Sequence, residues 1–254
     1  MKNKITVVVA GLGEIGRPLF DIVSGRYDAI GVDIPPFERI DKAEVLHICY
    51  PYQIKDFIAE TARYIDLFRP ALTIINSTVA VGTTRAIAEK TGSAVVNSPV
   101  RGKHARMLEE LHMYIKFVGA TNPAAGDQAA KHFQSLGIKT RILSSPEATE
   151  LAKLTETTYF GMMIAWAQEV ERYCDRWGPN YDEVVSFYEE IACLPRVKYF
   201  PGVIGGHCVM PNIEILNQDR RSVILEALQC SNEMKMEREI CRRDASTVVT
   251  EGAA

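Results

Sequence analysis

The sequence lacks a basic excess and any long apolar run. Its 29 lysines and arginines are outnumbered by 32 aspartates and glutamates, giving a net charge of −3. Nucleic acids and anionic membranes bind basic surfaces, so neither is expected as the main partner. No apolar run reaches the roughly 18 residues that span a bilayer, and Ile5–Ala10 is too short for a signal peptide. We expect a cytoplasmic protein with a small-molecule substrate.

The sequence also lacks paired cysteines and internal repeats. Neither a Cys-x-x-Cys pair nor a His/Cys spacing suited to zinc occurs, so no disulfide framework and no metal site are predicted. With 254 residues, 47% of them hydrophobic, the chain is long enough for a substantial core in two subdomains. The six cysteines are scattered: Cys49, Cys174, Cys193, Cys208, Cys230 and Cys241.

The first 145 residues alternate between strand-like and helix-like segments. This alternation predicts an α/β fold, a doubly wound, mainly parallel Rossmann-type sheet with helices on both faces, as domain 1–145. The predicted strands are Ile5–Ala10, Ala29–Asp33, Val45–Cys49, Leu72–Asn76, Ala94–Asn97, Tyr114–Val118 and Lys139–Leu143. The predicted helices are Glu14–Ser24, Gln53–Phe68, Thr83–Lys90, Ala105–Leu111 and Pro123–Leu136.

Residues 146–254 have a helical pattern instead. Ser144-Ser-Pro-Glu147 offers a capping serine and a proline suited to the first turn, and helical apolar spacing continues until Gly178-Pro179. A helix of about 32 residues is about 48 Å long, more than a small domain needs, so we predict a homodimer through it. A short helix (Tyr181–Ala192), a final helix (about Asn212–Arg242) and a frayed tail from Val248 complete an all-helical dimerisation and substrate domain.

The stretch Gly11-Leu-Gly-Glu14-Ile15-Gly16 follows the first predicted strand and opens the first helix. Gly11 permits the tight turn, Gly13 lets the backbone approach a pyrophosphate, and Gly16 allows close helix packing. Asp33 ends the second strand, where its carboxylate can bind the adenosine ribose hydroxyls and would repel a 2′-phosphate. These features predict NAD binding and favour NAD over NADP.

Two further loops lie at the carboxyl ends of predicted strands, where ligands bind in open α/β sheets. Tyr50 and Pro51 follow the third strand and could flank the adenosine. Ser77 and Thr78 follow the fourth strand, where they are either ligand contacts or simply turn and cap residues.

Candidate catalytic residues come from the helical half of the sequence. Glu150, Lys153 and Thr157 share one helix face, and a desolvated Lys153 could stabilise an oxyanion or exchange a proton. Cys208, after Gly205-Gly-His207, is a candidate nucleophile, and the alternative is a buried hydrophobic cysteine. His207 is either a loop anchor or a substrate contact. Arg101, Lys103 and His104 either receive an anionic group of the substrate or form a solvated turn.

Together these motifs resemble the UDP-glucose/GDP-mannose dehydrogenase family, which includes the UDP-N-acetylmannosamine dehydrogenases. The resemblance is carried by Gly11-x-Gly-x-x-Gly16, Ser77-Thr-Val-x-x-Gly-Thr-Thr84, Ser98-Pro99, Glu150-x-x-Lys153 and Gly205-Gly-His-Cys208. It implies oxidation of a sugar alcohol to a carboxylate with two NAD, through an aldehyde and a cysteine thioester. Cys208 would be the nucleophile, Lys153 the oxyanion stabiliser or proton relay, and Thr78 a holder of water or substrate.

The sequence departs from the family pattern in ways that affect this implied chemistry. Thr157 replaces a usual asparagine, Val100 a frequent glutamate, and Asn212 a usual aspartate that assists thioester hydrolysis. The family's C-terminal, nucleotide-sugar-binding domain has no counterpart in these 254 residues. We therefore expect NAD-dependent oxidation of a primary alcohol or aldehyde, nucleotide-sugar-like or smaller, through a Cys208 thiohemiacetal or slowly hydrolysed thioester.

Three other interpretations stay open. A two-electron dehydrogenase of the β-hydroxyacid type would also combine a Rossmann domain, a long helix and a catalytic lysine. A non-catalytic NAD-binding regulatory protein would bind the cofactor without turnover. A separate chain could also supply the C-terminal domain.

Overall fold

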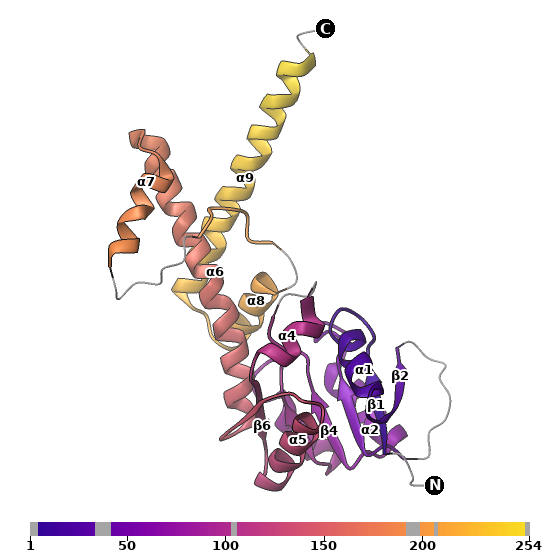
Figure 1. Cartoon of the computed structure of the whole chain (residues 1–254). Coiled ribbons are helices and arrows are strands. Elements are labelled where there is room, and N and C mark those ends of the chain that lie inside the picture. Colours follow the sequence, from indigo (N-terminus) through magenta and orange to yellow (C-terminus); the bar gives the residue numbers. More distant parts are fainter. Residues whose placement is uncertain (1–4, 34–41, 103–105, 192–198, 206–207, 252–254) are drawn as a thin grey trace. The chain divides into compact units, whose positions relative to one another are not determined.

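A computed structural model describes residues 5–33, 42–102, 106–191, 199–205 and 208–251, with side chains given as far as Arg243 (Figure 1). The chain divides into two compact units, Met1–Lys153 and Leu154–Ala254. The division falls inside helix α6 (Pro146–Trp177), whereas the sequence places the domain boundary at residue 145. Each unit is described below by itself.

Unit 1 is built on a seven-stranded sheet in the order β2-β1-β3-β4-β5-β6-β7. All neighbouring strands are parallel except β5 and β6, which are antiparallel. This confirms the predicted doubly wound, mainly parallel Rossmann-type sheet. The strands are β1 Thr6–Ala10, β2 Asp28–Val32, β3 Val45–Ile48, β4 Leu72–Ile75, β5 Val95–Asn97, β6 Lys116–Ala120 and β7 Thr140–Leu143.

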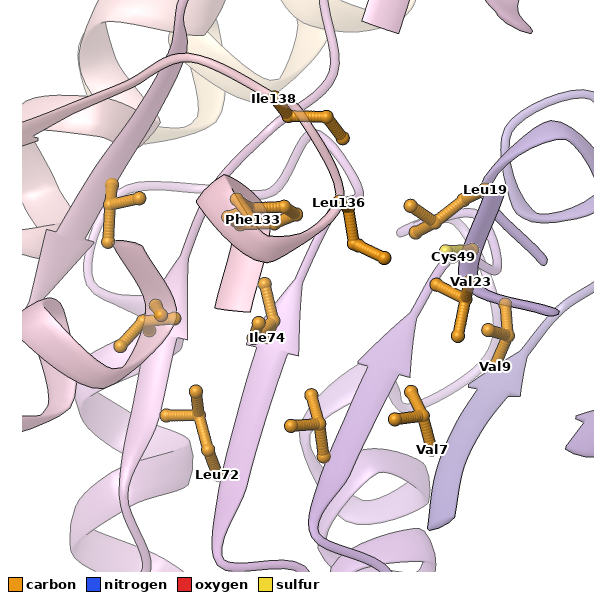
Figure 2. Packing of buried hydrophobic residues seen from close by; sticks show 14 of the residues in the cluster. Val7, Val9, Leu19, Val23, Cys49, Leu72, Ile74, Phe133, Leu136 and Ile138 are labelled. Carbon is orange, nitrogen blue, oxygen red and sulfur yellow. The ribbon is translucent and has the colours of Figure 1, made fainter. Parts of the chain in front are cut away.

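Helices cover both faces of the sheet because side chains alternate between the faces along each strand. On one face, Val7, Val9 and Ile74 pack with Leu19 of α1 (Gly16–Ser24) and Phe133 of α5 (Pro123–Ser135), as Figure 2 shows. Helix α4 (Met107–Met113) also contributes to this core. Each large apolar side chain buried there contributes about 1.5–3 kcal/mol relative to exposure.

The opposite face carries a second core. Val8, Leu46 and Ile75 of the strands pack with Phe68 of α2 (Phe57–Phe68) and Ile87 of α3 (Thr83–Thr91). The two cores make the central strands almost wholly apolar, as expected for a parallel sheet buried on both sides.

The strand order reverses at β1, and this places the candidate residues at one edge of the sheet. Ala10 at the end of β1 pairs with Val32 of β2 on one side and with Ile48 of β3 on the other. Gly11 and Asp33 therefore leave the sheet at neighbouring carboxyl ends. Ligands of open α/β sheets bind outside such a reversal.

Unit 2 is helical and contains most of α6, α7 (Tyr181–Ser186), a 3₁₀ turn η2 (Phe187–Glu190), α8 (Val209–Asp219) and α9 (Val223–Glu251). Helix α6 has the predicted bounds, which are set by local signals. Ser145 Oγ accepts a hydrogen bond of 3.2 Å from Ala148 N at its start, and Gly178 takes a positive φ of 89° after its end.

The single final helix predicted over Asn212–Arg242 is wrong, because it is two helices interrupted at 220–222. Arg220 has an extended backbone with φ −152° and ψ 126°. Ser222, a residue type favoured before a first turn, accepts the bond from Glu226 N through its carbonyl. The tail is also helical further than predicted, since α9 runs to Glu251. No helix in the described part of the chain is long and apolar enough to cross a membrane.

Candidate functional site

The turn between β1 and α1 depends on two glycines that tolerate no side chain. Gly11 has φ +88°, and a Cβ there would lie 2.6 Å from Tyr50 N. A Cβ on Gly16 would lie 1.7 Å from Gly11 O. These contacts confirm the close packing that the glycine spacing predicts.

Gly13 differs from these two because it faces open space. The structure places no described atom within 4 Å of a Cβ built on Gly13, and Gly13 and Glu14 are exposed. The side chain of Ile15, which precedes α1, makes no capping hydrogen bond, and the first turn of α1 carries no acidic residue. The N-terminus of α1 therefore suits the anionic pyrophosphate of a dinucleotide.

Asp33 lies beside this turn at the carboxyl end of β2. Its side chain is exposed, and its main-chain carbonyl accepts a bond of 3.3 Å from the Tyr64 hydroxyl. Its position fits a carboxylate that binds ribose hydroxyls. The residues of unit 1 thus fit a dinucleotide that carries no 2′-phosphate.

The loops after β3 and β4 are joined by a hydrogen bond. Ser77 Oγ donates to Tyr50 O over 2.6 Å, so the structure brings these two predicted residues together. The Tyr50 hydroxyl bonds Thr61 Oγ1 on α2 at 2.7 Å, and burial raises its pKa. The main chain of Tyr50 lines the glycine turn, since Tyr50 N is the atom that a Cβ on Gly11 would meet. Pro51 is exposed and Thr78 is half-buried.

Glu150, on the predicted functional face of α6, caps helix α3. Its carboxylate accepts bonds from Gly82 N (2.7 Å), Thr84 N (2.9 Å) and Thr84 Oγ1 (2.6 Å). Burial raises the pKa of Glu150, against the effect of these hydrogen bonds. Sequence reasoning missed this role, although the uncapped Gly82-Thr-Thr start of α3 was a signal. Lys153 lies one turn beyond Glu150 and is half-buried, as is Thr157 in unit 2.

A buried basic cluster, which sequence reasoning missed, lies on the α5 face of the sheet. His47 Nδ1 is 3.2 Å from Asn76 Nδ2, which can only donate, so a neutral His47 carries its hydrogen on Nε2 and donates to His132 Nε2 at 2.9 Å. Burial lowers the pKa of His132 to about 4 and that of His47 well below its usual value.

Lys116 belongs to the same buried region. Its Nζ donates to the carbonyl of Ser98 and lies 5.1 Å from the centre of the Phe133 ring. Burial lowers its pKa to about 7, and the proximity of Lys153 adds to this effect. A buried amine of this kind is neutral over much of the alkaline range.

In unit 2, Cys208 is exposed and occupies the position just before α8. Asn212 lies one turn later, where its N–H donates to Cys208 O over 3.3 Å and its side chain is buried. The structure therefore excludes the alternative of a buried hydrophobic Cys208. His207 lies outside the described residues.

Arg101, a predicted substrate contact, lies over two aromatic rings. Its guanidinium carbon is 5.5 Å from the Tyr114 ring centre and 5.7 Å from that of Phe117. Lys103 and His104 lie outside the described residues. Within the described ranges, no three His, Cys, Asp or Glu side chains gather to hold a metal ion.

Comparison with known proteins finds a family likeness in the helical part of the chain. Residues 147–237 match the central domain of the UDP-glucose/GDP-mannose dehydrogenase family. Over these residues the chain is similar to that central domain. The match covers α6 and the Cys208 region, which contain the motifs Glu150-x-x-Lys153 and Gly205-Gly-His-Cys208, and it extends into the first half of α9.

Curated relatives extend the likeness into the sheet. A UDP-N-acetyl-D-mannosamine dehydrogenase of Pyrococcus horikoshii is 32% identical over 154 residues, covering 56% of this chain and 36% of the relative. An NDP-N-acetyl-D-galactosaminuronic acid dehydrogenase of Ralstonia nicotianae is 26% identical over 265 residues, covering 80% and 62%. The chain thus matches less than two thirds of the length of either relative.

A solved structure shares the fold of this chain. The UDP-D-ManNAc dehydrogenase of Pyrococcus horikoshii superposes with a TM-score of 0.77 at 22% identity, covering 90% of this chain and 68% of that one. This likeness confirms the fold of a Rossmann-type sheet followed by a helical region.

Proposed function

We propose that this chain binds NAD at the β1–α1 turn and uses it to oxidise a primary alcohol or aldehyde, nucleotide-sugar-like or smaller. The observation that carries the proposal is the glycine turn, in which Gly11 and Gly16 interlock while Gly13 faces open space before a helix whose first turn carries no acidic residue. Gly11 to Gly16 would hold the pyrophosphate and Asp33 the adenosine ribose. When bound, NAD supplies a hydride acceptor.

Cys208 is proposed as the nucleophile. Oxidation of the alcohol carbon removes a hydride and the hydroxyl proton, leaving an aldehyde. The Cys208 thiolate adds to that carbon to form a thiohemiacetal, a second two-electron oxidation gives a thioester, and water releases the acid. Lys153 would stabilise the oxyanion, with Thr78 and Thr157 holding substrate or water.

Asn212 makes the last step slow in this scheme. A carboxamide cannot accept a proton from water at neutral pH, so no general base stands one turn after the nucleophile. The proposed enzyme therefore oxidises faster than it hydrolyses, and thioester accumulates on Cys208.

The relatives named for UDP-N-acetyl-D-mannosamine and UDP-glucose suggest the first substrates to test. Arg101, His104 and His207 remain candidate contacts for an anionic group of the substrate. A cytoplasmic location also stays a prediction.

The assembly proposed is a homodimer through α6. Tyr159, Trp166 and Tyr173 recur every seven residues on this helix and are each more than half exposed, and Trp177 is 74% exposed. Side chains seven apart lie on one helix face, and an aromatic stripe of this kind suits a helix-to-helix interface.

The decisive test of cofactor binding compares Gly13→Ala with Gly25→Ala. A Cβ at Gly13 meets no described atom but would occupy the space proposed for the pyrophosphate, whereas Gly25 follows α1 and meets only Ile22 O at 3.4 Å. Gly13→Ala should weaken NAD binding by at least about tenfold without lowering the melting temperature, as measured by calorimetric titration. Equal NAD affinity in both variants would contradict the proposed site.

The chemistry is tested by the NADH yield per mole of substrate and by intact mass. Two NADH per alcohol, with a covalent adduct that disappears in Cys208→Ser, support the thioester route. One NADH and undiminished turnover in Cys208→Ser indicate the β-hydroxyacid type of reaction. Tight NAD binding without turnover on UDP-sugars, small alcohols and aldehydes indicates a regulatory protein, or one that needs a separate chain.

A further inference from the structure

Asn232 of α9 bonds the main chain before Cys208 and contacts a side chain after it. Its Oδ1 accepts from Ile204 N at 2.7 Å, and its Nδ2 donates to Ile204 O at 3.0 Å. The same Nδ2 lies 3.8 Å from Met210 Sδ. One buried amide thus contacts the chain four residues before the cysteine and two residues after it.

Gln168 of α6 completes this arrangement. Its Nε2 donates to Gly202 O over 2.7 Å, and the same group lies 3.4 Å from Asn232 Oδ1. Its Oε1 accepts from Ser231 Oγ at 2.9 Å, and Ser231 Oγ in turn accepts from Arg172 Nη2 at 2.9 Å. Both amides are fully buried, as is Ile204, so losing the two bonds to Ile204 would leave desolvated backbone groups unpaired.

The segment is also fixed on its far side. Val209, directly after Cys208, is buried against α6 at Gly161, where a Cβ would lie 2.4 Å from Val209 Cγ1. An exposed thiol therefore stands between two anchored residues, Ile204 and Val209. Two buried side-chain amides thus hydrogen-bond the main chain at Gly202 and Ile204, just before Cys208.

We propose that Asn232 and Gln168 are positioning residues that hold Cys208 for reaction. This inference rests on the proposed role of Cys208 as the nucleophile. The amides fix the approach of the chain to α8, and the thiol keeps one placement beside the first turn of that helix. Such a placement fixes the direction from which the sulfur attacks an aldehyde carbon.

The test uses Asn232→Ala and Gln168→Met, with Asn217→Ala as the control. Asn217 also joins α8 to α9, through Gln229 at 3.3 Å, but within the described residues it makes no hydrogen bond to the segment before Cys208. Iodoacetamide labelling is followed at each cysteine by peptide mass spectrometry, so that exposed Cys230 on α9 is the reference inside the same molecule.

In both Asn232→Ala and Gln168→Met, the ratio of labelling at Cys208 to labelling at Cys230 should fall about tenfold, because the free energy of roughly one hydrogen bond that orders the segment is lost. The pH profile of Cys208 labelling should change as well. Asn217→Ala should keep the wild-type ratio and profile. In turnover, kcat should fall while the Kd for NAD stays unchanged. Wild-type ratios in both Asn232→Ala and Gln168→Met would overturn the proposal.

Failure of the proposed function gives a different result. If Cys208→Ser turns over normally while Asn232→Ala and Gln168→Met still change the labelling ratio, the nucleophile assignment is wrong and the positioning of the thiol stands. If Cys208→Ser is inactive while Asn232→Ala and Gln168→Met keep the wild-type labelling ratio and kcat, only the positioning proposal is wrong.

Discussion

At the scale of single residues, Lys116 is a basic side chain in unfavourable, buried surroundings. It stands on β6 with its amine covered by α5, near Cys49, His47 and Lys153. The burial of a charged amine costs free energy, so its pKa falls to about 7. The sequence predicted a strand over Tyr114–Val118, but which of its side chains α5 would cover depends on tertiary packing, and Lys116 was not predicted to be buried.

Lys116 should make the fold more stable as pH rises from about 7 to about 10.5. In that window the unfolded chain still binds a proton that the folded protein has released, so each further rise in pH favours folding. Lys116→Met should be more stable at pH 7 by about 1–3 kcal/mol and should lose this slope. Urea unfolding at pH 7.5 and 9.5 measures both effects.

The control is Lys131→Met, because Lys131 on α5 is exposed. It should retain the wild-type difference between the two pH values. An equal slope in wild type and Lys116→Met would show that the amine is hydrated or paired in the folded protein.

At the scale of elements, Glu150 connects two helices of unit 1. Replacing it with the isosteric glutamine places an NH₂ group against the N–H of Gly82 or of Thr84. Glu150→Gln should therefore lower the free energy of unfolding by about 1–3 kcal/mol, measured by chemical denaturation.

Glu147→Gln is a matched control for this prediction. Glu147 lies on the same helix and pairs with exposed Arg85 at 2.5 Å, and surface ion pairs contribute little. Equal destabilisation by the two substitutions would mean that Glu150 does not cap α3.

The helix bounds show which elements sequence reasoning can reach. Both ends of α6 follow from local signals, Ser145 with Pro146 at the start and Gly178 at the end. The break at Arg220–Ser222 was missed because α8 and α9 are both amphipathic and no glycine or proline separates them. Ser222 was the available signal, but one serine inside a helical pattern is weak.

At the scale of the whole molecule, the proposed homodimer depends on the exposed aromatic stripe of α6. Trp166→Lys should shift wild-type dimers to monomers, because a lysine would be desolvated at the centre of the interface. Sedimentation velocity over a concentration series measures this change. Phe187→Lys, which alters a still more exposed aromatic outside α6, should leave the dimer intact. A monomeric wild type at all concentrations would contradict the dimer itself.

The candidate site was predictable where local backbone chemistry sets it. Gly11, Gly16 and Asp33 could be identified because a tight turn and a strand end follow from neighbouring residues. The Asn232 and Gln168 contacts could not, since they join residues 28 and 34 positions from their partners. Buried amides have no periodic signature in a sequence.

Glu150 has a consequence for where an external anion can go. Helix N-termini attract negative charge, and those of α1, α2 and α3 follow β1, β3 and β4 near the reversal. The α2 and α3 termini already accept carboxylates of the protein itself, Asp56 and Glu150, whereas the first turn of α1 carries no acidic residue. By filling two of these positions with its own carboxylates, the protein directs a phosphate to α1, and a variant without Glu150 would offer a second, misplaced site.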